Sequence, residues 1–79
     1  MFQKMKLKRA IKKSKERIAE IEQKRSRSQA ALVEAILSHT DPDDRDVDYF
    51  NHFTGMIEAE RAHMHELMRQ LDELEIKKS

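Results

Sequence analysis

Glu60 and His63 have the spacing of a metal-binding motif. Residues three apart lie on one side of a helix, and the pattern Glu-x-x-His supplies ligands in carboxylate-bridged di-iron bundles. Such a site also needs inward carboxylates from the other helices. The residue expected level with Glu60 is Arg25, a cation that would repel a metal. We therefore predict no metal site and no bound cofactor.

A run of aspartates in the middle of the chain resembles a calcium-binding loop in composition only. It consists of Asp41, Asp43, Asp44, Asp46 and Asp48. An EF-hand loop needs a glycine at its sixth position and a glutamate at its twelfth, and no start within this run provides both. We interpret the run as a solvated acidic turn that caps a helix.

The first part of the chain is strongly basic. Against the single acid Glu16 stand Lys4, Lys6, Lys8, Arg9, Lys12, Lys13, Lys15 and Arg17. Clustered cations can bind phosphates, so a nucleic-acid-binding regulator is the alternative function, with contacts from Lys8, Arg9, Lys12 and Lys13. The segment lacks interleaved aromatic residues, which single-strand binders use for stacking.

Nothing in the chain indicates an enzyme. There is no cysteine nucleophile, the single glycine cannot form a phosphate-binding loop, and no Ser-His-Asp arrangement is evident. Two helices alone also form no deep pocket. We therefore predict a non-enzymatic protein without a small-molecule substrate.

The elements that position these residues are expected to be long helices. The chain has 79 residues, 39% of them charged, with one glycine and one proline, a composition typical of coiled coils. Its length limits it to a single domain over 1–79. No apolar run approaches the roughly 18 residues of a membrane span, and no apolar signal sequence precedes the lysines. The expectation is a cytoplasmic protein without a membrane partner.

The helix boundaries follow from one cluster of turn residues around Pro42. Proline disfavours helix at the residue before it and suits the first helical position, and Asp41 is a good N-cap with Asp46 as a rival. We predict a helix over about 3–38, a turn over about 39–46 and a helix over about 43–77. Glycine weakens a helix, so the sequence leaves open whether the second helix bends or breaks near Thr54 and Gly55.

Each predicted helix carries an apolar stripe with a seven-residue period. The first stripe is Leu7, Ile11, Ser14, Ile18, Ile21, Arg25, Ser28, Leu32 and Ala35; the second is Phe50, Phe53, Ile57, Glu60, Met64, Leu67, Leu71 and Leu74. Such stripes form a coiled-coil seam. The sequence therefore predicts an all-α fold, an antiparallel two-helix hairpin.

A turn centred near 42–43 sets the register of that hairpin. It places Ser28 level with Ile57, Ile21 level with Met64, and Arg25 level with Glu60. The last pair would be a polar layer that fixes the register.

The charges of the two halves favour the same folding back. Residues 1–39 hold 11 Lys and Arg against 4 Asp and Glu, and residues 40–79 hold 5 against 11. Net charges of +7 and −6 make the halves complementary, although each surface pair contributes little stability. On one edge we expect Lys8 near Glu75 and Glu22 near Arg61.

Two helices cannot enclose a core, and the apolar stripe widens toward the turn. The expected self-association or partner face is Ile36, Val47, Tyr49, Phe50, Phe53 and Met56. A second copy would complete a four-helix bundle, and a different protein filling the same face is the competing arrangement. The predicted function is a small interaction module acting as an adaptor, a regulator or a structural subunit.

Overall fold

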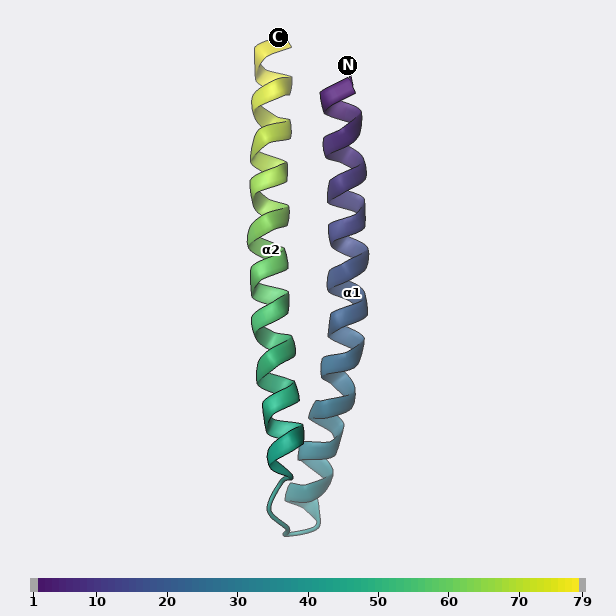
Figure 1. The fold of residues 1–79 in the computed structure, drawn as a ribbon, viewed down its shortest axis with the longest axis vertical. Helices are drawn as coiled ribbons and strands as arrows, with labels where there is room; N and C mark the ends of the chain where they lie inside the picture. The colour runs from purple at the N-terminus through teal and green to yellow at the C-terminus, as the bar shows by residue number, and fades with distance from the viewer. Residues whose placement is uncertain (1, 79) are drawn as a thin grey trace.

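The protein is an antiparallel hairpin of two long helices. A computed structural model describes residues 2–78, in which α1 spans Phe2–Leu37 and α2 spans Asp44–Lys78. The helices lie side by side along a rod of 60 × 16 × 14 Å (Figure 1). No strand occurs within residues 2–78. The predicted fold class is confirmed, and each helix boundary falls within one residue of the expected position.

The second helix runs without interruption through Gly55, which answers the question that the sequence left open. Gly55 is exposed, and a Cβ added there would meet nothing within 4 Å. Its backbone does not have a positive φ. The glycine therefore costs helix stability without interrupting the helix.

A left-handed residue ends α1. His39 has a φ of 56°, its N–H donates to the Ile36 carbonyl at 3.1 Å, and the Thr40 N–H donates to the Ala35 carbonyl at 2.9 Å. These two bonds form a Schellman motif, which satisfies carbonyls at a helix end. Pro42 follows and prevents the helix from continuing.

The N-cap of α2 is Asp43. Its Oδ1 accepts the backbone N–H of Arg45 at 3.0 Å, and its carbonyl accepts the N–H groups of Asp46 and Val47. The predicted caps, Asp41 and Asp46, are wrong. The Schellman motif and Pro42 hold residues 38–43 outside a helix, so the first residue able to cap is Asp43.

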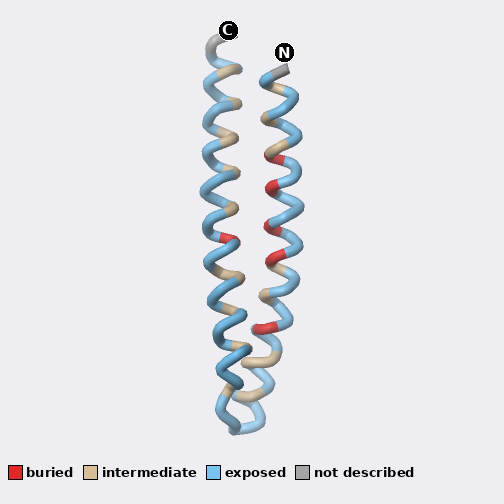
Figure 2. The backbone as a smooth tube through the Cα atoms, in the orientation of Figure 1, coloured by how far each residue is buried: buried red, intermediate tan, exposed pale blue. Residues whose placement is uncertain are grey.

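The predicted seam is the contact between the helices. Each of its residues, from Leu7 to Ala35 and from Phe50 to Leu74, is buried or half-buried. The buried apolar residues among those described are Ile11, Ile18, Ile21 and Ile57, and Ser14 and Ser28 are buried beside them (Figure 2). Within residues 2–78, every buried side-chain nitrogen and oxygen has a hydrogen-bond partner.

The register differs from the prediction by about one heptad. Ile57, which is only 1% exposed, packs with Ile18 and Ile21 and not with Ser28, which lies seven residues further along α1. The chain reverses midway between Leu37 and Asp44, earlier than the predicted centre at 42–43. A shift of seven residues keeps the two apolar stripes together, so both registers are possible in principle. The observed register surrounds Ile57 with apolar side chains, whereas the predicted one would place it against Ser28, and the apolar contact is the more favourable.

Neither helix combines the length and the apolar character needed to cross a bilayer, as far as residues 2–78 show.

Candidate interaction surfaces

A polar contact crosses the seam between Ser14 and Glu60. The Ser14 hydroxyl lies 2.8 Å from Glu60 Oε1 and 3.4 Å from the Glu60 carbonyl oxygen. Arg17 approaches the same carboxylate oxygen at 3.7 Å. The Glu60 side chain is 15% exposed and Ser14 is buried, so this bond lies largely out of water. A hydrogen bond to a mostly buried carboxylate ties the two helices in one register.

The predicted layer of Arg25 and Glu60 is wrong. The Arg25 guanidinium lies over the Phe50 ring at 5.9 Å from its centroid, a cation–π contact. The one-heptad shift separates Arg25 from Glu60 and leaves the carboxylate to Ser14 and Arg17. The polar element of the seam is therefore a serine–glutamate contact with an arginine at its edge.

The histidines and carboxylates of the described residues do not cluster as metal ligands would. No group of three or more His, Asp or Glu side chains in the described chain could hold an ion. His63 is exposed, whereas Glu60 points into the seam. Position 63 therefore does not add a second ligand beside Glu60.

A cluster of charges on α2 has perturbed pKa values. Arg69 hydrogen-bonds both carboxylate oxygens of Glu66, at 2.6 and 3.0 Å, and pairs with Glu73. The bonds from Arg69 and then from Gln70 lower the pKa of Glu66 from 4.5 to about 2, and Glu66 in turn raises the pKa of Arg69. All of these residues are exposed, so the cluster stabilises charged forms on the surface.

The ion pair of Glu22 with Arg61, at 2.8 Å, defines one edge of the hairpin. We call it the Glu22 edge. Ile36 lies two heptads beyond Glu22 in α1, and Val47 lies two heptads before Arg61 in α2, so both belong to the same edge. Both are exposed, Ile36 at 63%. The expected pairing of Lys8 with Glu75 does not occur; Lys4 pairs with Glu75 at 3.4 Å.

Tyr49 and Met56 lie on the opposite edge, which we call the Tyr49 edge. Tyr49 is two residues from Val47, about 200° around the helix, and Met56 is one heptad further. Both are exposed, Tyr49 at 53%, and the Tyr49 ring stacks on Phe53 at 6.1 Å. The predicted partner face is therefore divided between two edges, with Phe50 and Phe53 half-buried in the seam between them.

A shallow hollow of about 480 Å³ lies beside the turn. It is lined by Ala31, Glu34 and Ala35 of the last α1 turns, by Ser38, Thr40 and Asp43 of the loop, and by Asp46 at the start of α2. Ala31 occupies the heptad position of α1 that belongs to the Tyr49 edge. Small side chains near the end of α1 thus leave a hollow that opens, by heptad position, on the edge to which Tyr49 also belongs.

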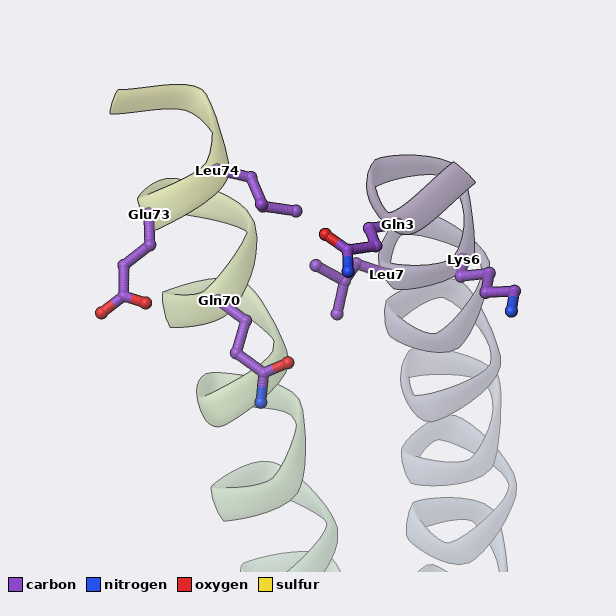
Figure 3. Close-up of a pocket in the computed structure, with 6 residues that line it drawn as sticks. All are labelled: Gln3, Lys6, Leu7, Gln70, Glu73 and Leu74. Carbon is purple, nitrogen blue, oxygen red and sulfur yellow. The ribbon is translucent and has the colours of Figure 1, made fainter. Parts of the chain in front are cut away.

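A groove of about 380 Å³ lies at the other end, where the helices terminate. Leu7 and Leu74 point toward each other across it, and Gln3 points toward α2 beside Leu7 (Figure 3). Gln70 and Glu73 line the α2 side. The groove has an apolar floor and an amide rim, and its two titratable lining residues, Lys6 and Glu73, each point away from the opposite helix (Figure 3).

The basic segment of α1 remains exposed. The four residues predicted as nucleic-acid contacts, Lys8, Arg9, Lys12 and Lys13, are all at the surface. None of them forms an ion pair with another described residue. No carboxylate of α2 forms a direct ion pair with any of the four among the described residues.

Sequence reasoning missed the contact of Ser14 with Glu60 and the hollow at Ala31. One signal was available for each. Ser14 and Glu60 are polar residues at seam positions of opposite helices, and Ala31, Ala35 and Ser38 are small residues close to the turn. Neither feature can be predicted until it is known which residues of α1 lie level with which residues of α2.

No protein-family model matches the chain, and comparisons with curated proteins and with solved structures found no match.

Proposed function

We propose that the protein is a small non-enzymatic protein–protein interaction module, an adaptor, regulator or structural subunit, that self-associates through the turn half of the hairpin. One observation carries the proposal: no residue from 29 to 56 is buried. Yet six of the eight exposed large hydrophobic side chains described lie there: Val33, Ile36, Leu37, Val47, Tyr49 and Met56. Exposed apolar side chains gathered in one half of a small protein, on both of its edges, favour an interaction surface there.

The small core supports the same proposal. The buried apolar residues lie between Ile11 and Ile21 and at Ile57. These positions are in the middle of the hairpin and toward the end that carries the two termini. A domain of this size buries only about 60% of the surface that its unfolded chain exposes. Small scaffolds without disulfides often gain the missing stability by oligomerisation. A cover over the turn half would supply it here.

The occupant that we propose is a second copy, packed on the Tyr49 edge with both turns at the same end. A two-fold axis along the rod then places α1 of one copy against α2 of the other. Their opposite charges, +7 and −6 in the two halves of the sequence, favour this pairing.

The hollow fits this arrangement. Because Ile57 packs with Ile21, Tyr49 is level with a position about two residues before Ala31. Side chains of a helix lean toward its N-terminus, so Tyr49 of each copy reaches toward the turn and enters the Ala31 hollow of the other. Two such insertions make an isologous contact, and tyrosines in pockets are frequent hot spots of binding.

Sedimentation equilibrium over a wide concentration range tests the proposal. We expect a mass near twice 9.4 kDa for the unmodified chain. Tyr49→Glu and Ala31→Arg should each yield a folded monomer, because one removes the inserted ring and the other fills the hollow. Asn51→Glu adds the same charge at an exposed position outside the Tyr49 edge and should remain dimeric. A monomeric unmodified chain at high concentration would contradict self-association.

A further inference from the structure

Six cations follow one another along the N-terminal part of α1 without an ionic partner. They are Lys6, Lys8, Arg9, Lys12, Lys13 and Lys15, which we call the basic stripe; all six are exposed. None forms an ion pair or a side-chain hydrogen bond within the described chain. Surface lysines and arginines this dense create a strong positive potential along the helix.

Three of the carboxylates near the stripe are engaged elsewhere. Glu75 pairs with Lys4, Glu73 with Arg69, and Glu60 with Arg17 and Ser14. Of the acids left near this end, Glu16 and Asp72 are exposed and form no ion pair among the described residues. Six cations against these two unpaired acids leave this end of the hairpin with a net positive charge.

We propose that the basic stripe binds the phosphate backbone of duplex nucleic acid without reading its sequence. Lys8, Lys12 and Lys15, at positions i, i+4 and i+7, lie along one face of α1, and a helix places such neighbours about 5–6 Å apart. Duplex DNA presents one negative charge per roughly 1.7 Å of its axis, so a linear row of cations matches it at any position.

The hairpin's width determines how it meets the duplex. The major groove of B-form DNA is about 12 Å wide, enough for one helix. The hairpin measures 16 × 14 Å in cross-section, and the inward side of α1 is covered by α2. The stripe therefore lies across the backbone and not inside the groove. Base edges stay out of reach, so binding depends on charge alone.

Three other partners fit less well: a membrane surface, a protein and single-stranded nucleic acid. An amphipathic helix binds a membrane surface by inserting an apolar face, but the apolar face of α1, from Ile11 to Ile21, is buried against α2. A protein partner needs a buried anchor for affinity, and the stripe contains no large apolar or aromatic side chain. Single strands gain affinity by stacking on aromatic rings, and exposed Tyr49 lies near the turn, far from the stripe.

This binding is separate from self-association. The three lysines Lys8, Lys12 and Lys15 follow the Glu22 edge and the outward side of α1, whereas the proposed dimer contact lies on the Tyr49 edge. A dimer with both turns at one end carries its two stripes at the other end.

Fluorescence anisotropy with a labelled mixed-sequence DNA duplex of about 20 base pairs tests the proposal on the full-length protein. We expect binding at 25 mM salt, equal affinity for a scrambled duplex, and a slope of log K against log salt between about −3 and −5, since six cations contact at most six phosphates. The same slope weakens binding by about a hundredfold to a thousandfold between 50 and 200 mM salt. An RNA duplex should bind comparably.

Matched variants assign the binding to the stripe. Lys8→Gln, Lys12→Gln and Lys15→Gln together should weaken binding at least tenfold and flatten the slope by about 3. The control combines Lys24→Gln, Arg27→Gln and Arg45→Gln, which removes the same charge at exposed positions elsewhere and should change affinity less than threefold. Unchanged circular dichroism in both variants ensures that folding is not the cause.

Four outcomes would overturn the proposal: no binding at 25 mM salt, the same loss in both triple variants, tighter binding to vesicles with 30% anionic lipid than to the duplex, or equal binding to polyglutamate. Repeating the assay with Tyr49→Glu separates it from self-association. A monomer that still binds the duplex supports the stripe independently of the dimer.

Discussion

The Ser14 hydroxyl donates a hydrogen bond of 2.8 Å to a carboxylate oxygen of Glu60 on the opposite helix. It lies in a seam that is otherwise mostly apolar, and it fits only the register in which Ile57 meets Ile18 and Ile21. A shift by one heptad would move the two residues about 10 Å apart along the rod. This contact thus acts as the register device that the sequence had assigned to Arg25.

Ser14→Ala should lower the free energy of unfolding by about 2 kcal/mol, because the mostly buried carboxylate of Glu60 loses a hydrogen-bond donor. Urea unfolding followed by circular dichroism measures the change. Ser26→Ala is the matched control, since Ser26 is exposed on the same helix and forms no side-chain hydrogen bond in the described chain. Equal effects of the two substitutions would mean that the contact contributes nothing.

Engineered cysteine pairs test the register directly, because the chain has no cysteine of its own. Ile21→Cys with Ile57→Cys should form an intramolecular disulfide on mild oxidation, because these residues pack together. Ser28→Cys with Ile57→Cys should not, since its second sulfur lies about one heptad away and disulfides need Cα atoms within about 7 Å. Mass spectrometry of the oxidised monomer reads the result. Efficient linkage of the second pair would restore the originally predicted register.

The features that the sequence predicted are those set by local pattern. The seven-residue apolar period identified the seam positions, and Pro42 with its flanking aspartates located the turn. The apolar period recurs along both helices, and the turn residues cluster around Pro42. A misread residue in either pattern would therefore not change the predicted hairpin. The same pattern placed Glu22 with Arg61, a pair that the observed register also allows.

The register could not be obtained in this way, because a heptad pattern is unchanged by a shift of seven residues. The choice then depended on how the chain reverses, and the Schellman motif at His39 was not anticipated in the absence of a glycine. Several features that depend on which residues of the two helices lie level were therefore mispredicted or missed. These include the partner of Glu60, the position of Arg25 over Phe50, and the free state of the basic stripe.

Gly55→Ala should raise the free energy of unfolding by about 0.5–1 kcal/mol. The added methyl group meets nothing within 4 Å and the residue lies in the interior of α2, so the gain is the reduced conformational entropy of the unfolded chain. Ala59→Gly, at another exposed position of α2, is the reverse control and should lower stability by a similar amount. Thermal unfolding of both variants provides the comparison. A destabilised Gly55→Ala protein would indicate a contact at this face, such as a partner chain.

The contact of Arg69 with Glu66 predicts a specific loss of stability in acid. The pKa of Glu66 falls from 4.5 to about 2 because Arg69, and then Gln70, donate to its ionised carboxylate. A group whose pKa is lower in the folded state stabilises the fold above its unfolded pKa. Its contribution is therefore complete above about pH 4.5 and disappears as the pH falls toward 2. Because the groups are exposed, added salt should weaken the effect.

Arg69→Gln should return the pKa of Glu66 toward 4.5, which carbon NMR of the labelled carboxyl group can follow. The variant should also lose less stability than the unmodified protein between pH 4.5 and 2, since the linkage is gone. Arg27→Gln removes an exposed arginine that has no ion pair in the described chain and should leave the titration of Glu66 unchanged. If Glu66 titrates alike in all three proteins, the pairing does not persist in solution. In that case α2 relies on its apolar stripe alone at this level.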